Sequence, residues 1–156
     1  YREIDRLRAD EEGAVRFTVS PRGNAYLAVK TRAEPPQTSL GLLVKVRPTV
    51  SVELSDDTPP RLSPTTVSGV LEPAADGAAV NLQIRGEERW RTVATTTAQP
   101  VPPAEEGEEP PAQSRYEVSL LPRRSGRYRV AVPATEGLAR GVSETRRVRV
   151  EATASG

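Results

Sequence analysis

The residue types that carry most enzyme chemistry are scarce in this chain. Its 156 residues include no His and no Cys, so His- or Cys-based zinc sites, Ser-His-Asp triads and Cys nucleophiles are excluded. It contains neither a Ser-x-x-Lys motif nor a glycine-rich phosphate loop. A pair of carboxylates, as in glycoside hydrolases, would need a deep cleft that a small sandwich rarely offers. We therefore expect no enzymatic activity.

Acidic residues gather at two places that could hold a cation. Asp56 and Asp57 are adjacent, and a second cluster occupies residues 105–109 with the sequence EEGEE. Calcium takes several oxygens from converging loops, and neither cluster has the Asp-x-Asp-x-Asp spacing of a dedicated loop. The sequence predicts no metal ion and no cofactor.

The second acidic cluster lies in a proline-rich insert over residues 99–113, QPVPPAEEGEEPPAQ. Proline removes backbone donors and the glutamates repel one another, so we expect an extended, exposed loop. The insert is either a loop expansion that the fold tolerates or a contact element that meets a basic face. On the second interpretation Glu105, Glu106, Glu108 and Glu109 are candidate partner contacts.

Trp90 is the only tryptophan, and Arg91 follows it. Tyr1, also followed by an arginine, occupies the matching place in an internal repeat. An aromatic residue at equivalent positions of two copies favours packing against the core of the fold. The alternative is an exposed platform on which a sugar stacks, which makes Trp90 and Arg91 candidate ligand contacts.

Basic residues concentrate near the C-terminus, although the net charge is only +1. Residues 122–151 contain eight arginines and three glutamates. Strand alternation predicts that these arginines form a solvated sheet face. A polyanion such as teichoic acid is the alternative ligand of this face. Nucleic acid is not expected, because the charge is nearly neutral and no aromatic residues interleave the arginines.

Apolar and polar residues alternate with a period of two, and helical periodicity is nearly absent. Each alternating segment has one face to bury and one to solvate, as an antiparallel sheet requires. No segment has the length of a membrane helix, so no membrane span is expected. The pattern predicts seven strands in the second part of the chain, near residues 49–55, 66–72, 79–85, 89–97, 115–121, 126–132 and 141–151. It predicts four in the first part, near residues 1–8, 14–19, 24–31 and 39–47.

The two parts are copies of one pattern. Residues 1–4 (YREI) match residues 90–93 (WRTV) at an offset of 89, and Val46 matches Val148 at an offset of 102. A repeat of this size corresponds to one β-sandwich module. The sequence therefore predicts an all-β chain. Its expected units are the C-terminal half of an immunoglobulin-like domain over 1–48, a complete seven-stranded immunoglobulin-like antiparallel sandwich over 49–151, and a tail or linker start over 152–156.

Four strands cannot close a seven-stranded sandwich, because no equivalents of residues 49–89 precede Tyr1. Three explanations stay open: the missing strands belong to a longer polypeptide, another chain supplies them by strand exchange, or the half domain packs directly on the second domain. The short join over residues 46–50 contains Pro48, which limits bending. The modules are therefore expected to stack as a semi-rigid rod.

Tyr128 opens the sixth predicted strand of the complete module, and Tyr26 is its counterpart in the first copy. A tyrosine at this place is expected to form a tyrosine corner, in which the hydroxyl binds the backbone a few residues earlier.

Five segments of the second copy point to a known family. They are residues 65–73 (TTVSGVLEP), 77–83 (GAAVNLQ), 89–96 (RWRTVATT), 126–132 (GRYRVAV) and 141–150 (GVSETRRVRV). In these segments the second copy resembles the tandem bacterial immunoglobulin-like modules of actinobacterial and related secreted and cell-surface proteins. The first copy resembles them more loosely. The family usually has a short glycine-containing turn where this chain has the insert.

The resemblance implies a non-catalytic structural module of an extracellular multidomain surface protein, stalk or filament. The expected place is outside a bacterial cell or on its surface. Neighbouring modules or identical subunits are the expected partners, with strand exchange between subunits as a variant. The alternative function is an adhesion module, or one that binds cell-wall polysaccharide.

Overall fold

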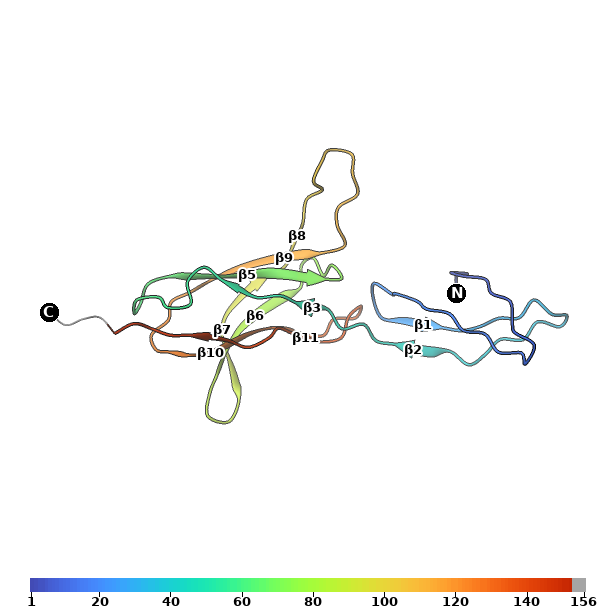
Figure 1. The fold of residues 1–156 in the computed structure, drawn as a ribbon, viewed down its shortest axis with the longest axis horizontal. Coiled ribbons are helices and arrows are strands. Elements are labelled where there is room, and N and C mark those ends of the chain that lie inside the picture. The colour runs from blue at the N-terminus through green and yellow to red at the C-terminus, as the bar shows by residue number, and fades with distance from the viewer. Residues whose placement is uncertain (153–156) are drawn as a thin grey trace.

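The structure is a computed structural model that describes residues 1–152. Of the predicted tail over 152–156, residues 153–156 lie outside the described residues. Within the described range every element is a β-strand, and no helix long and apolar enough to cross a membrane occurs there. The prediction of an all-β chain is confirmed. A larger body over residues 49–152 continues from a smaller ribbon over residues 1–48 (Figure 1).

The larger body consists of two five-stranded antiparallel sheets. The first sheet contains, in spatial order, β11 (Gly141–Val142), β10 (Gly126–Val132), β6 (Ala79–Arg85) and β7 (Trp90–Thr97), and β12 (Arg146–Val148) also pairs with β10. The second contains β3 (Thr49–Val50), β5 (Thr65–Glu72), β9 (Ser114–Leu120) and β8 (Gln99–Pro100), and β4 (Glu53–Leu54) also pairs with β5. The chain passes from one sheet to the other at the buried Ala98, between β7 and β8.

The apolar faces of the two sheets meet in one core. Val67 and Leu71 come from β5, whereas Leu82 and Val130 come from β6 and β10, and all four belong to one buried cluster. Burying a side chain of this size stabilises the fold by about 1.5–3 kcal/mol. Two antiparallel sheets that share a core have the arrangement of a β-sandwich.

Alternation predicted the strands of this body closely. The segments 79–85 and 126–132 form strands over those residues, and the segments 66–72, 89–97 and 115–121 differ by one residue at one or both ends. The predicted strands 49–55 and 141–151 are each broken in two, giving β3 with β4 and β11 with β12. The short strand β8 lies in the insert, where only a loop was predicted.

Serine side chains maintain the pairing where these outer strands are broken. Between β3 and β4, the Ser51 amide donates to the Val70 carbonyl at 3.0 Å, and the Ser51 Oγ accepts from the Val70 amide at 2.8 Å. Between β11 and β12, the Ser143 amide donates to the Val130 carbonyl at 2.8 Å, and its Oγ accepts from the Val130 amide at 2.8 Å. A hydroxyl thus replaces a carbonyl of the ladder, so the amides of Val70 and Val130 keep a partner.

The end of the larger body returns beside its beginning. The Arg149 amide donates to the Asp57 carbonyl at 2.8 Å, and the Glu151 amide donates to the Pro59 carbonyl at 3.1 Å. Pro60 and Glu151 form a parallel bridge. The segment that follows β4 and the segment that follows β12 therefore run parallel to each other and are hydrogen-bonded.

The ribbon over residues 1–48 has much less regular structure than predicted. It contains β1 (Ala25–Leu27) and β2 (Leu42–Val44), which pair with each other, and an isolated bridge between Lys30 and Thr38. The predicted strands 24–31 and 39–47 are shortened to these elements, and the predicted strands 1–8 and 14–19 do not form. A strand needs a neighbour for its amides and carbonyls, and no described segment pairs with these two.

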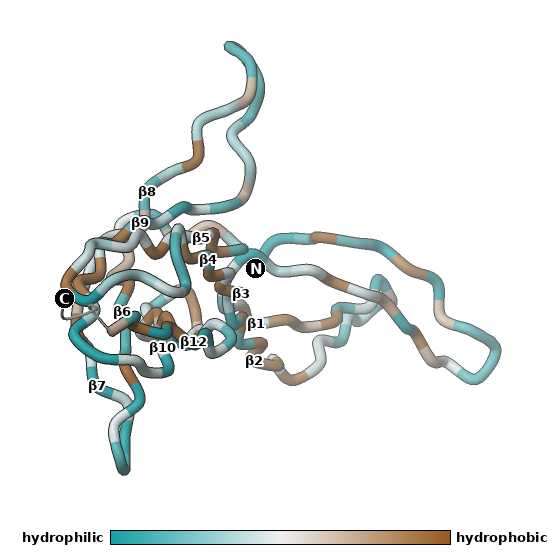
Figure 2. Tube along the Cα trace, turned by 60° about the vertical axis from the view of Figure 1, so that its left-hand side comes forward, coloured by the Kyte–Doolittle hydropathy of each residue, from teal (hydrophilic) through white to brown (hydrophobic). Residues whose placement is uncertain are grey.

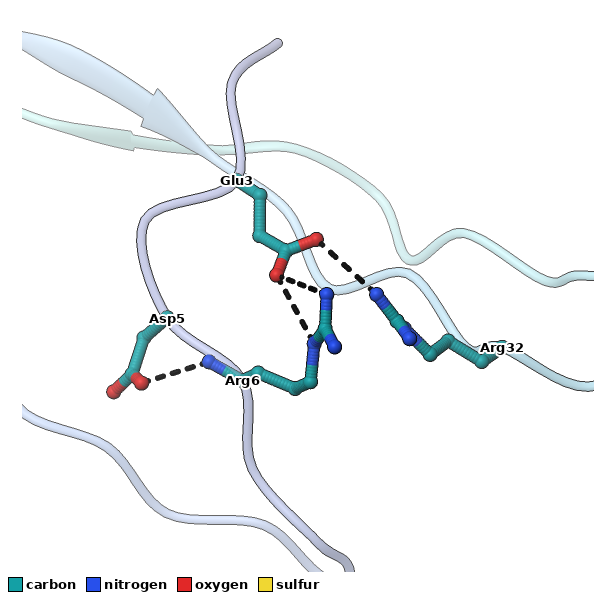
Figure 3. Close-up of polar contacts among 4 residues, drawn as sticks. All are labelled: Glu3, Asp5, Arg6 and Arg32. Carbon is teal, nitrogen blue, oxygen red and sulfur yellow. Dashed lines mark hydrogen bonds and ion pairs between the residues drawn. The ribbon is translucent and has the colours of Figure 1, made fainter.

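Exposed ion pairs are the polar contacts of the first residues. The Glu3 Oε1 lies 2.9 Å from the Arg6 Nη2, and the Glu3 Oε2 lies 3.8 Å from the Arg32 Nη2 (Figure 3). Residues 3–6 therefore lie beside Arg32, which follows the strand β1. Exposed pairs of this kind contribute about 0–1 kcal/mol each, so they do not replace a sheet.

The ribbon repeats a hydrogen-bond pattern of the larger body. The Val29 amide donates to the Ser39 Oγ at 2.9 Å, the Ser39 amide donates to the Val29 carbonyl at 2.8 Å, and the Ser39 hydroxyl donates to the Leu40 carbonyl at 3.1 Å. Val130 and Ser143 make the same first two bonds, and the Ser143 hydroxyl donates to the Glu144 carbonyl at 2.8 Å. The pair β1–β2 and the strand β10 with β11 and β12 therefore share a bonding motif between a valine and a serine.

The tyrosine corner does not form at the predicted residues. Tyr128 is 4% exposed and lies in the core, whereas its counterpart Tyr26 is 65% exposed. Within residues 1–152 neither the Tyr128 nor the Tyr26 hydroxyl makes a hydrogen bond. Tyr116 on β9 makes the long-range contact instead, because its hydroxyl donates to the Ser51 carbonyl.

Gly69 is the residue that makes room for this contact. It is the register partner of Tyr116 in the pair β5–β9. A Cβ at residue 69 would lie 2.1 Å from the Ser51 carbonyl oxygen and 2.7 Å from the Tyr116 hydroxyl. No larger residue fits between the tyrosine and the backbone that it binds.

Replacing Gly69 with Ala is therefore expected to destabilise the sandwich. The added methyl must displace backbone at Ser51 and break the Tyr116 hydrogen bond, which costs about 2 kcal/mol or more. Urea denaturation followed by circular dichroism measures the free energy of unfolding. Gly137→Ala is the matched control, because a Cβ there meets nothing within 4 Å. Equal stabilities for the two variants would contradict this account.

The same tyrosine predicts a loss of stability in alkali. Burial, and secondly the negative charge of Glu53, raise the pKa of Tyr116 above its usual range. The folded state therefore favours the protonated phenol. Its contribution is complete below the unfolded pKa of about 10 and is lost as the pH rises further. The free energy of unfolding should fall above about pH 10, and Tyr116→Phe should make this fall less steep. Tyr1→Phe, at a residue 98% exposed, should leave the slope unchanged.

Candidate interaction surfaces

Trp90 lies on the outer face of the first sheet. It opens β7 and is the register partner of Arg85 on β6, one residue beyond Ile84, whose side chain points into the core. Since neighbouring strand residues point to opposite faces, Trp90 and Arg85 face outward together. Trp90 is half-buried and belongs to no part of the core. The expectation that it packs into the core is wrong, because the register places it opposite an outward residue.

Two arginines pack on the Trp90 ring. The Arg129 Cζ lies 4.4 Å from the ring centroid, and the Arg85 Cζ lies 5.8 Å from it. Arg129 also donates from its Nε to the Gln83 Oε1 at 2.9 Å. Cation–π attraction and this hydrogen bond together fix the plane of the Arg129 guanidinium.

A third arginine adds to this positive surface. The pKa of Arg129 is lowered, first by burial and then by the charges of Arg140 and Arg85. We call Arg85, Arg129 and Arg140 the arginine cluster. Within residues 1–152 the ion pairs join Glu3 to Arg6 and Arg32, and Glu144 to Arg146. No carboxylate among the described residues forms an ion pair with the cluster.

The wider basic segment has the predicted solvated character. Seven of the eight arginines in residues 122–151 are exposed, and only Arg129 is half-buried. The sequence predicted this solvent-facing surface but gave no sign of the contact between Arg129 and Trp90. This contact arises because β10 and β7 both pair with β6, and strand pairing cannot be seen in the sequence of one segment.

The acidic loop projects from the other sheet. Residues 101–113 connect β8 to β9 and extend away from the sandwich (Figure 1). The loop exposes four glutamates, Glu105, Glu106, Glu108 and Glu109. A turn at the tip of the loop is closed by a hydrogen bond of 3.2 Å, which the Glu108 amide donates to the Glu105 carbonyl. The prediction of an exposed loop is confirmed. We call residues 105–109 the glutamate loop.

The structure separates the candidate contact residues into three places. Trp90 is on the outer face of the first sheet, and the glutamate loop extends from the second. Arg91 is exposed and is the register partner of Ile84. Its side chain therefore points from the edge strand β7 to the face opposite to that of Trp90. No single site contains all the predicted residues.

Hydrogen bonds fasten the ribbon to the larger body. The Asn24 amide donates to the Gly137 carbonyl at 2.7 Å, and the Ala139 amide donates to the Val46 carbonyl at 2.7 Å. The Asn24 Oδ1 accepts from the Val46 amide at 2.8 Å. The buried Pro48 packs on Gly141, where a Cβ would lie 2.8 Å from the proline Cγ. The join is thus a packed and bonded contact.

The ribbon leaves apolar side chains uncovered. Tyr26 and Leu42 on the two strands are 65% and 67% exposed, and Leu40 is 95% exposed. Apolar residues also line the segment before β1, where Val15 and Phe17 lie, and Figure 2 shows apolar stretches throughout this thin unit. Contiguous exposed apolar surface of this kind is typical of a surface that contacts another element or chain.

Acidic residues of the described range are spread over separate places. Within that range no group of three or more Asp, Glu, His or Cys residues is placed to hold a metal ion. Asp56 caps its own turn by accepting from the Thr58 amide at 2.9 Å. Two open hollows, of about 390 and 320 Å³, each have one carboxylate in their lining, Glu72 and Glu87 respectively.

The comparisons with known proteins give no further assignment. No protein family and no curated protein sequence matches this chain.

The environment of Trp90 predicts an ion-selective quenching of its fluorescence. Because Arg129 and Arg85 lie over the ring, iodide should quench Trp90 more strongly than caesium does. Arg129→Gln should lower the ratio of the iodide to the caesium Stern–Volmer constant. Arg115→Gln is the matched control, since Arg115 is exposed on β9 of the other sheet. A ratio near one in the unaltered chain would contradict the observed stacking.

Proposed function

We propose that this chain is a non-catalytic structural section of an extracellular bacterial surface protein built of immunoglobulin-like modules arranged end to end. The observation that carries the proposal is the repeated serine pattern, at Val29 and Ser39 and again at Val130 and Ser143. The same kind of bond recurs in both parts of the chain, at offsets of 101 residues for the valine and 104 for the serine, close to the repeat offset of 102, and this supports two copies of one module. The order of strands around the shared core supports an immunoglobulin-like topology.

The joint between the two units supports stacking along an axis. Asn24, Val46 and Ala139 are bonded across or within the joint, and Pro48 is buried in it. A flexible linker would make no such contacts. In this proposal the units are spacers that hold a distance, which requires stiffness and no active site.

The open edge of β1 supports completion of the first unit by further strands. In the larger body β10 pairs with β6 on one side and with β11 and β12 on the other. In the ribbon β1 pairs with β2 alone among residues 1–152, so within this range the edge that corresponds to the β6 side has no partner. We propose that strands with the pattern of residues 49–89 cover this edge and the exposed apolar residues. They come either from the same polypeptide or from an identical subunit.

A platform for neutral sugars receives less support. Stacking of a sugar requires a free aromatic face, and Arg129 already lies 4.4 Å from the centre of the Trp90 ring. The geometry therefore favours the structural role over the glycan-binding alternative.

Fusing a second copy of residues 49–89 ahead of Tyr1 tests this proposal. The junction Arg89–Tyr1 then reproduces the junction Arg89–Trp90 of the complete module. We expect the exposed apolar surface to be covered, so that binding of the dye ANS per chain falls and the exchange of amides in residues 25–44 slows. The gain in covered surface also raises the urea m-value.

The matched control replaces Val80, Leu82 and Ile84 by Ser in the fused copy only. These residues face the core of the complete module, so the control keeps the length and loses the cover. If the fusion and the control bind ANS equally, the first unit is not half of such a module.

A further inference from the structure

Two surfaces of opposite charge lie on opposite sides of the sandwich, each without an ion-pair partner in residues 1–152. The arginine cluster is on the outer face of the sheet that contains β6, β7 and β10, whereas the glutamate loop joins two strands of the other sheet. The sheets pack face to face across one core. Neither surface reaches the other within one chain.

We propose that the arginine cluster is the docking site for the glutamate loop of a second copy of this chain. The contact is lateral, between the sides of two sandwiches. It is separate from the end-to-end joint and does not depend on the role proposed above for residues 1–48.

The Arg129 side chain is prepared to bind a carboxylate. Its Nε is bound to Gln83 and its plane rests near the Trp90 ring, while the terminal nitrogens make no hydrogen bond within residues 1–152. Two terminal N–H groups held in one plane match the two oxygens of a glutamate. Because Arg85 lies at the same ring and the charges of Arg140 and Arg85 lower the pKa of Arg129, an incoming carboxylate relieves repulsion as well as forming new bonds.

The loop is built to reach another molecule. Prolines at residues 102, 103, 110 and 111 flank the four glutamates on both sides, and the loop extends far from its own sheet (Figure 1). Proline stiffens the two arms and lowers the conformational entropy that docking must remove. None of the four glutamates pairs with a basic group in residues 1–152.

Charge complementarity within the one chain favours a second copy over an unrelated polyanion. The net charge of +1 conceals two separated groups, three arginines on one side and four glutamates on the other. A loop on one copy and a cluster on the next form a heterologous contact, which leaves a free loop and a free cluster at the two ends. A contact of a few charged residues is small, so it is weak and sensitive to salt.

Sedimentation velocity of the full chain tests the contact at low and at high ionic strength. We expect reversible association at about 20 mM NaCl and an association constant lowered about tenfold or more at about 300 mM. Two charge-reversed variants follow: Glu105, Glu106, Glu108 and Glu109 to Lys, and Arg85, Arg129 and Arg140 to Glu. Each alone should be monomeric, and an equimolar mixture of the two should associate again.

Two further variants keep this test decisive. R85E/R140E leaves Arg129, Trp90 and Gln83 in contact, so it reports on charge if the triple variant fails to fold. Arg115→Glu removes an arginine from the other sheet and should leave association unchanged. Circular dichroism confirms that each variant is folded.

Three outcomes would overturn the proposal. The first is a full chain that stays monomeric at low salt up to about 1 mM. The second is association that high salt does not weaken, because such association would arise from the exposed apolar residues of the ribbon over residues 1–48. The third is a mixture of variants that does not associate. If the monomeric chain binds polyglutamate or an acidic polysaccharide and the R85E/R140E variant does not, the cluster serves a foreign polyanion instead.

Discussion

An antiparallel sheet with alternating residues has one apolar face, and that face must be covered. In residues 49–152 two such sheets cover each other, and the other features of the body follow from this arrangement. The outer faces are left to polar residues, so arginines accumulate there at no cost to the core. Tyr116 and Gly69 belong to the same requirement, because the tyrosine ring fills the core where the glycine leaves space and its hydroxyl holds the outer strand. Residues 1–48 have the alternating pattern without the covering sheet, and they remain a thin ribbon.

The sequence predicted the elements that depend on local pattern. The strands near 79–85 and 126–132 were predicted because each alternates; β6 is buried on one face, whereas β10 is also buried at Ala131 on its other face. The segment 14–19 carries the same signal and the segment 1–8 was predicted from its match to residues 90–93, yet neither forms a strand. A strand also needs a neighbour, and alternation within a segment holds no information about whether that neighbour exists. The serine bonds at Ser39 and Ser143 were missed for the same reason, since they replace ladder bonds at places set by register.

The candidate surfaces likewise differ in whether local sequence or strand pairing determines them. The glutamate loop was predicted as exposed, because proline content and charge repulsion act within the loop itself. The arginine cluster was not predicted as a unit. Arg85 and Arg129 meet at Trp90 because β6 pairs with β7 on one side and with β10 on the other, and Arg140 adds its charge to Arg129 from the connection between β10 and β11. The outward direction of Trp90 follows from its pairing with Arg85, which no local pattern fixes.

The parallel contact between the first and last segments determines how the body responds to mechanical load. If the module transmits tension from its neighbour through Pro48 to the residues beyond β12, the pull on Asp57 and Pro59 is directed against the pull on Arg149 and Glu151. Because these segments run in the same direction, the force acts along the strands and strains both hydrogen bonds, from Arg149 to Asp57 and from Glu151 to Pro59, at the same time. An antiparallel pair loaded at one end would open like a zipper, one bond after another. Shear of this kind loads both bonds together, so it resists rupture better than the opening of bonds one after another.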